Sequence, residues 1–85
     1  MKTYTIYYVE KRNRAELLKK MEVEAKTAAE AKKICKERFY EKTKKNAFRP
    51  QTSVKAHMWN KDDTERIAKI EAEIEKDGYS IIGHY

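Results

Sequence analysis

Apolar and polar residues follow two different periods along the chain, and the change between them falls at Thr27. Before it, residues 3–10 and 17–25 carry apolar side chains at every second position, with Lys19 as an exception, which is typical of half-buried β-strands. After it, apolar side chains recur at the spacing of one face of an α-helix. The pattern predicts a β-hairpin that leads directly into a helix.

The first strand is apolar on both faces. Tyr4, Ile6 and Tyr8 point to one side, and Tyr7 and Val9 point to the other. Such a strand suits the interior of a sheet better than its edge, where the second face would stay in contact with water. We therefore expect residues 3–10 to form a central strand.

A capping box supports the start of the first helix. Thr27 and Glu30 have the spacing at which each side chain binds the backbone N–H of the other residue, so the helix should begin at Ala28. We expect it to extend to about Lys44. Its buried side would consist of Ala28, Ala31, Ile34, Cys35 and Phe39.

Residues 43–52 are predicted to be a connector, because Pro50 cannot lie inside a helix and favours an extended conformation of Arg49. A third strand is then expected over about residues 52–59. Its alternation would direct one set of side chains toward the helices, namely Val54, Ala56 and Met58.

The other side of that third strand would lie on the open face of the sheet. His57 and Trp59 would be there, beside Tyr7 if the strands are neighbours. An open face with aromatic side chains is either a recognition surface or is covered by the C-terminal segment, and the sequence leaves both alternatives open.

A second helix is expected after residues 62–64, where Asp62 and Glu65 have capping-box spacing. Gly78 would end it, and residues 79–85 could return as a short strand. We therefore predict a single α+β domain over residues 1–85. It would have two layers, an antiparallel sheet with two helices on one face, in the order ββαβα with a short final strand.

Charge is distributed unevenly along the chain. Residues 1–61 contain 17 Lys and Arg against 7 Asp and Glu, giving +10, and residues 62–85 contain 3 against 7, giving −4. A basic body of this kind is typical of proteins that contact polyanions, although a lysine-rich surface also promotes solubility. The distribution favours a nucleic-acid partner without requiring one.

Four basic segments are candidate contacts. The predicted hairpin loop, the return strand, the outer face of the first helix and the connector contribute a set that comprises Lys11, Arg12, Arg14, Lys19, Lys20, Lys33, Lys36, Tyr40, Lys44, Lys45 and Arg49. Tyr40 could stack on a base or lie along the lysine stems. The aromatic open face adds Tyr7, His57 and Trp59 as further contacts.

The residues needed for catalysis are sparse. Cys35 lies on the buried side of its helix, and His57 and His84 lack any ligand or triad spacing. We therefore expect no enzyme activity, no cofactor and no metal. The single cysteine and the absence of a long apolar run favour a cytoplasmic protein with no membrane contact.

The run VEAKTAAEAKKICKE, residues 23–37, carries a resemblance. It resembles the strand-to-helix junction of small phage and mobile-element proteins, including the arm-type DNA-binding domains of tyrosine recombinases, over about 20 of the 85 residues. The third strand that precedes the helix in the arm-binding domain is missing here. The resemblance implies a phage or mobile-element origin, where DNA-binding accessory proteins and anti-CRISPR inhibitors of similar size are common.

These features predict a small basic binding module without enzyme activity. Its first expected partner is nucleic acid or a nucleoprotein, bound with weak specificity and strong salt sensitivity because Lys outnumbers Arg 15 to 5. The alternative is a protein-binding inhibitor of a host defence effector, with an acidic or nucleic-acid-binding protein as its partner.

Overall fold

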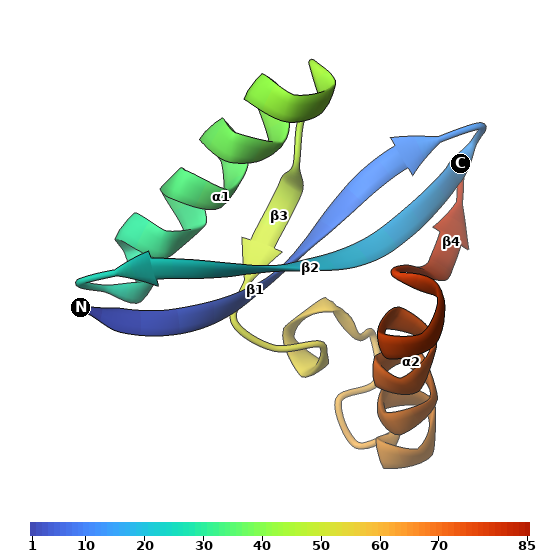
Figure 1. Cartoon of the computed structure of the whole chain (residues 1–85). Coiled ribbons are helices and arrows are strands. Elements are labelled where there is room, and N and C mark those ends of the chain that lie inside the picture. Colours follow the sequence, from blue (N-terminus) through green and yellow to red (C-terminus); the bar gives the residue numbers. More distant parts are fainter.

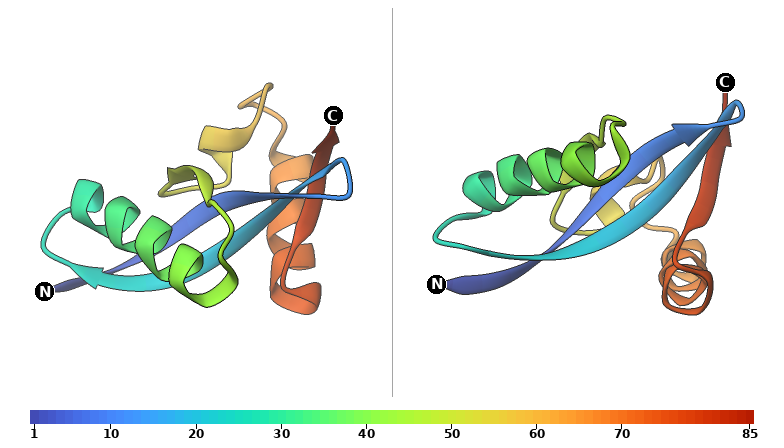
Figure 2. Two further views of the ribbon diagram at one scale, coloured as in Figure 1. Left: turned by 90° about the horizontal axis from the view of Figure 1, so that it is seen from above. Right: turned by 45° about the horizontal axis from the view of Figure 1, so that its top comes forward.

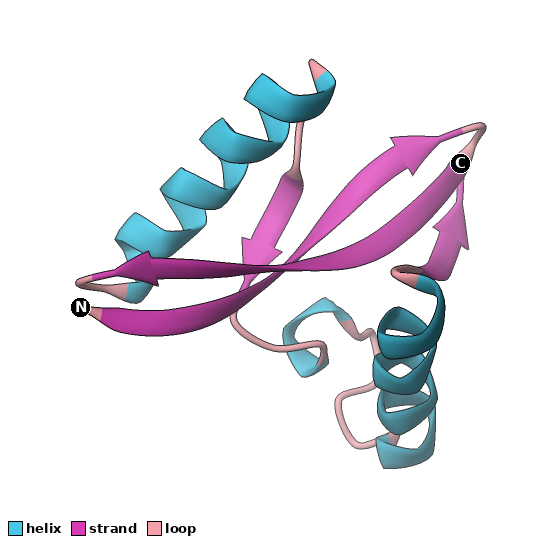
Figure 3. Cartoon of the chain, in the orientation of Figure 1, coloured by secondary structure: helices cyan, strands magenta, loops and turns pink.

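The computed structural model describes all 85 residues as an α+β domain with one antiparallel sheet and two helices (Figures 1 and 3). Its elements, in chain order, are β1 (Lys2–Arg12), β2 (Ala15–Ala25), α1 (Ala28–Thr43), β3 (Phe48–Gln51), the 3₁₀ turn η1 (Lys55–His57), α2 (Thr64–Asp77) and β4 (Ser80–His84). The strand order is β3-β1-β2-β4. This confirms the fold class, the central position of the first strand and the final strand.

The hairpin is longer and its turn tighter than predicted. Asn13 and Arg14 alone connect β1 to β2, with φ values of 50° and 63°. Positive φ at both central residues is what a type I′ turn requires, and this turn matches the twist of the two strands. Lys11 and Arg12 therefore belong to β1, and residues 11–16, left between the strands predicted over residues 3–10 and 17–25, do not form a loop of six residues.

The two helices cover opposite faces of the hairpin, which corrects the prediction that both lie on one face (Figure 2). Ile6 and Val23 pack against α1 in a core of eight buried residues. Val9 and Leu18, which point the other way along the same strands, pack against α2 in a core of six. Because both faces of β1 are apolar, each face needs its own cover.

The helix ends follow the sequence closely. The Thr27 hydroxyl accepts a hydrogen bond from the Glu30 N–H at 3.2 Å, and α1 ends at Lys44 in the left-handed region with φ 61°. Asp63, one residue later than predicted, caps α2, and Gly78 ends it with φ 84°. The capping signals thus place both helices to within a residue.

The third strand lies earlier than predicted. Residues 48–51, within the predicted connector, form β3, whereas residues 52–59 form a turn around η1. Val54 and Met58 are buried as expected. Because they are four residues apart, a helical turn can bury both side chains just as a strand can. The Ser53 hydroxyl accepts from the Ala56 N–H and stabilises that turn.

Both edge strands contain a bulge. Tyr7 pairs with Gln51 and Val9 with Phe48, so β3 has one extra residue in this interval. Arg49 lies in it with φ 46°, which contradicts the extended conformation expected before Pro50. Glu16 pairs with Gly83 and Leu17 with Ile81, so Ile82 is the extra residue in β4. Bulges bend a strand and redirect its side chains.

Candidate functional site

A buried carboxylate close to the hairpin tip gathers cations from three segments. Glu10 of β1 is only 1% exposed. The Nζ atom of Lys19 in β2 lies 2.5 Å from its Oε1, and the Lys45 Nζ and one Arg12 guanidinium nitrogen each lie 3.3 Å from its Oε2. We call these four residues the Glu10 cluster. Three positive charges against one negative charge leave a net charge of +2.

The surroundings of Glu10 keep it ionised. Burial raises its carboxyl pKa, but the hydrogen bond and charge of Lys19, together with Lys45 and Arg12, outweigh burial and lower the pKa below its ordinary value of 4.5. A carboxylate buried to this degree must be paired, so it fixes the positions of its cationic partners. The cations are therefore ordered before any ligand binds.

The lysine stripe of α1 consists of Lys33, Lys36, Tyr40 and Lys44, and all four side chains are exposed. None of the three lysines forms an ion pair. The Lys44 Nζ lies 5.8 Å from the centre of the Tyr40 ring, within the range of a cation–π contact. The stripe thus presents three lysines that form no ion pair along one side of the helix.

The Glu10 cluster lies beside the C-terminal end of α1, where the stripe also ends. Lys45, which follows the helix cap, pairs with Glu10. The Nζ of Lys19 lies 6.0 Å from the centre of the Phe39 ring, in the last turns of the same helix. We call the stripe and the cluster together the α1-side surface. Arg12, Lys19 and Lys45, which are far apart in the sequence, are therefore gathered at Glu10 beside this end of α1.

Other predicted contacts lie elsewhere. Lys20 points to the opposite face of the hairpin and forms an ion pair with Glu75 of α2. The Lys11 Nζ is also on that face, 4.9 Å from the centre of the Phe48 ring and 5.2 Å from that of Tyr85. Arg14 is exposed in the hairpin turn. The predicted set therefore divides between two sides of the molecule.

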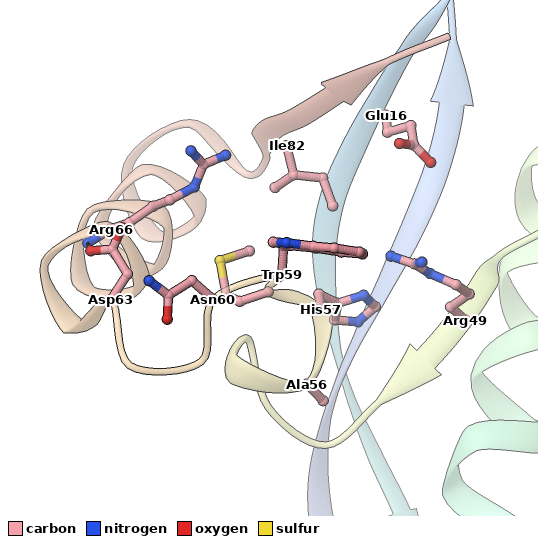
Figure 4. Close-up of a pocket in the computed structure, with 10 residues that line it drawn as sticks. Glu16, Arg49, Ala56, His57, Trp59, Asn60, Asp63, Arg66 and Ile82 are labelled. Carbon is pink, nitrogen blue, oxygen red and sulfur yellow. Dashed lines mark hydrogen bonds between the residues drawn. The ribbon is translucent and has the colours of Figure 1, made fainter.

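A groove of about 510 Å³ opens on the α2 side (Figure 4). We call it the Trp59 groove, because the indole of Trp59 is fully exposed at 102% and lies among the other lining residues. The lining comes from η1 and the loop after it, from α2, and from the strands β2, β3 and β4. It comprises Glu16, Arg49, Ala56, His57, Met58, Trp59, Asn60, Asp63, Arg66 and Ile82.

His57 fixes η1 against the sheet. It is 9% exposed, and its Nε2 lies 2.9 Å from the carbonyl oxygen of Tyr7, so this nitrogen carries the proton and donates it. Burial lowers the pKa of His57 below 6.5, and the charges of Arg49 and Lys61 lower it further, against the effect of the Tyr7 hydrogen bond. The ring is therefore neutral at physiological pH.

The sequence predicted an open face of the sheet with exposed aromatic side chains, but the structure covers this face. Tyr7 is half-buried against the second core, and burial followed by the charges of Glu71 and Glu22 raises its pKa. His57 is buried beside it. Of the three residues predicted there, only Trp59 is available to a partner, because α2 and η1 cover this face of the sheet.

A second hollow has a volume of about 280 Å³. It lies near the hairpin tip, on the face of the hairpin that α1 covers further along, but beyond the reach of the helix. Leu17, Tyr79 and Ile81 supply its apolar side, with Tyr79 42% and Ile81 51% exposed, and Arg12 and Lys19 also line it. The sequence analysis did not single out Tyr79 or Ile81. One feature of the sequence could have indicated them: residues 78–85 form the longest stretch of the chain without a charged side chain.

Glu10 was also missed. It continues the alternation of Tyr4, Ile6 and Tyr8, so its side chain points to the core face of β1. A carboxylate at such a position requires cationic partners. That reasoning, applied to the sequence, would have indicated a charge cluster at this point of the hairpin.

The remaining chemistry is limited. Cys35 is buried, and burial raises its thiol pKa to about 11, which suits a packing residue rather than a nucleophile. No group of three or more His, Cys, Asp or Glu side chains could hold a metal ion. No helix combines the length and apolar character needed to cross a membrane.

Comparison of this chain with protein-family models, with curated proteins and with solved structures finds no match. The resemblance of residues 23–37 to phage and mobile-element proteins therefore stays a prediction.

Proposed function

We propose that this protein binds nucleic acid without catalysing a reaction, and that the α1-side surface makes the contact. The observation that carries the proposal is the Glu10 cluster. A buried carboxylate holds cations from β1, from β2 and from the segment after α1 at one place, and still leaves a net charge of +2. A phage or mobile-element setting, which residues 23–37 imply, is part of the same proposal.

The lysine stripe extends that cluster along α1. Lys33 and Lys44 are separated by eleven residues, which corresponds to roughly 16 Å at about 1.5 Å per residue. One nucleic-acid strand of a duplex spaces its phosphates about 3.4 Å apart along the axis, so the stripe can face about four or five of them. Lysines act as point charges here, so the proposed binding is weakly specific and sensitive to salt.

The test is a measurement of affinity against salt concentration. Fluorescence anisotropy of labelled mixed-sequence DNA and RNA, at roughly 50 to 200 mM salt, gives the number of phosphates neutralised from the slope. The variant Lys36→Glu with Lys44→Glu changes two stripe lysines that form no ion pair. The matched control, Lys69→Glu with Lys76→Glu, makes the same charge change on the exposed side of α2.

The stripe variant should reduce the slope by about 1.8 for duplex DNA, since each phosphate contact contributes about 0.9. The control should reduce the affinity far less, because only its long-range charge effect remains and salt screens it. The absence of any complex at the lowest salt, or an equal loss in both variants, contradicts the proposal.

A second candidate function is inhibition of a host defence effector by direct protein binding. The second hollow favours it, because an edge strand without charged residues can add an extended segment of another protein. Arg12 and Lys19 in its lining would suit an acidic partner segment. A protein partner that survives nuclease treatment, and is lost in Ile81→Lys but kept in the stripe variant, would support this candidate over the first.

A further inference from the structure

The two bulges of the sheet direct their extra residues into one place. Arg49 in β3 and Ile82 in β4 lie on opposite edges of the sheet, yet both line the Trp59 groove (Figure 4). Bulges are frequent beside binding and active sites because they redirect side chains. Both edge strands therefore have a bulge beside the same groove, and each bulge contributes a side chain to its lining.

Arg49 occupies a strained conformation in that bulge. Its φ of 46° is in the left-handed region, which is unfavourable for a residue with a Cβ atom and which glycine adopts freely. Strain of this kind is concentrated at functional sites. The guanidinium group of Arg49 forms no ion pair in the chain, so it is free to contact a ligand in the groove.

Trp59 contributes nothing to the core. Its indole is fully exposed, although an aromatic ring of this size can bury roughly 150–250 Å². The loop that carries it is nevertheless held in place. Met58 before it is buried, the Asn60 side chain accepts a hydrogen bond from the Asp62 N–H, and Lys61 Nζ donates to the Lys55 carbonyl. A flat aromatic surface is therefore presented on an ordered loop.

The charges in the groove are balanced. Arg49 and Arg66 are opposed by Glu16 and Asp63, and His57 is neutral. A ligand that offers only negative charge would therefore gain little binding energy in this groove. A nucleotide would gain more, because its base can stack on the indole, its amino groups can donate to a carboxylate such as Glu16, and its phosphates can accept from guanidinium groups.

We propose that the Trp59 groove binds an unstacked base of single-stranded nucleic acid. The base stacks on Trp59, and the phosphates that flank it contact Arg49 and Arg66. This inference rests on the proposed function and makes it more specific, because bases in a duplex are stacked on each other and cannot reach the indole. The volume of about 510 Å³ is in the range of small-molecule sites and accommodates one nucleotide.

The edge strand β3 connects this groove to the α1-side surface. Lys45 pairs with Glu10 on one face, and Arg49, four residues later, lines the groove on the other. Their Cα atoms are at most about 14 Å apart, at roughly 3.3–3.6 Å per residue. A single strand that crosses the β3 edge can therefore contact both surfaces at once.

Trp59 is the only tryptophan, so its fluorescence reports on the groove alone. The experiment titrates the full chain with a mixed-sequence single strand of about 12 nucleotides, a length within the range that single-strand binding domains cover. The matching duplex is titrated in parallel. Tryptophan emission should be quenched by the single strand and unaffected by the duplex.

Three variants give the proposal its controls. Trp59→Ala should lower single-strand affinity about 5- to 160-fold, the usual effect of removing a stacking aromatic, and leave duplex affinity unchanged. Tyr79→Ala removes an exposed aromatic outside the groove and should change neither affinity. Arg49→Gly should weaken single-strand binding while the melting temperature stays equal or rises, because glycine relieves the strained φ.

The possible failures are distinct. Single-strand binding that leaves tryptophan emission unchanged and does not depend on Trp59 overturns this inference but leaves the proposed function intact. Failure of every nucleic acid to bind overturns the proposed function and this inference with it. Equal losses of single-strand and duplex affinity in Trp59→Ala overturn the claim of base stacking.

Discussion

The two sides of the hairpin share the same two strands but use them differently. On the α1 side a buried carboxylate organises cations, and the helix carries five Lys and Arg against three Glu. On the α2 side the helix carries three Lys and Arg against five acidic residues, and the exposed features are a tryptophan and two arginines in a groove. The difference indicates that charge is supplied on one side and aromatic surface on the other.

The largest expected effect comes from breaking either core. Phe39→Ala on the α1 side and Ile74→Ala on the α2 side should each reduce the free energy of unfolding by about 2–5 kcal/mol. Because both cores pack on β1 and β2, urea unfolding followed by circular dichroism should show one transition in each variant. Two separate transitions would mean that the sides fold independently. Tyr40→Phe, at an exposed position, serves as the control.

The next effect isolates the Glu10 cluster. Glu10→Gln should reduce the free energy of unfolding by about 2–4 kcal/mol. This is somewhat less than the loss expected for breaking a fully buried ion pair, because the cationic partners of Glu10 reach solvent. Glu24→Gln, an exposed position, should change stability by less than about 0.5 kcal/mol. Urea denaturation at neutral pH measures both variants, and equal small effects would show that Glu10 does not organise its neighbours.

The same residue also predicts a pH dependence. The pKa of Glu10 is lowered on folding, so its contribution to stability is complete above the ordinary carboxyl value of 4.5 and is lost as the pH falls through the lowered value. Below pH 4.5, Glu10→Gln should therefore lose less stability than the parent protein does. Parallel pH profiles of the two proteins contradict this assignment.

His57 gives a smaller pH effect, specific to the α2 side. Because its pKa is lowered on folding, the unfolded chain binds more protons below pH 6.5, and stability falls as the pH decreases through that region. Each unit of separation between the folded and unfolded pKa corresponds to about 1.4 kcal/mol. NMR titration of the imidazole measures the folded pKa, and His84→Gln assigns the two histidine signals. A folded pKa above 6.5 would show that the ring is not protected by burial.

The smallest expected effect concerns the ion pair that links the hairpin to α2. Lys20 and Glu75 are both partly exposed, so a double-mutant cycle with alanine should give a coupling energy of about 0.2–1 kcal/mol that disappears at high salt. A coupling that persists in high salt would indicate that this contact, rather than the second core, positions α2.

Local signals in the sequence were sufficient for most elements. The change of period at Thr27, the caps of both helices and Gly78 lie at or within one residue of the predicted positions, because short-range hydrogen bonds and φ preferences determine them. The third strand was placed wrongly because the alternation of Val54, Ala56 and Met58 includes a four-residue spacing that also fits a helical turn. Periodicity alone cannot separate these cases over so short a segment.

Long-range features could not be predicted. The two apolar faces of β1 were visible, but which helix covers each face depends on how the chain returns after α1 and after β3. The candidate cations were identified, yet only the fold shows that Arg12, Lys19 and Lys45 meet at Glu10 while Lys20 pairs with Glu75. The groove depends on bulges in two edge strands, which leave no clear trace in composition.

The most direct measurement is NMR mapping of the binding surface. A uniformly ¹⁵N-labelled chain is titrated with a single strand of about 12 nucleotides, and backbone amide shifts are followed by residue. The account predicts the largest shifts at Lys36–Lys45, at the hairpin tip and at Phe48–Arg49, together with the Trp59 indole N–H, and small shifts at Lys69 and Lys76. Shifts confined to the outer side of α2, or none at all, would contradict it.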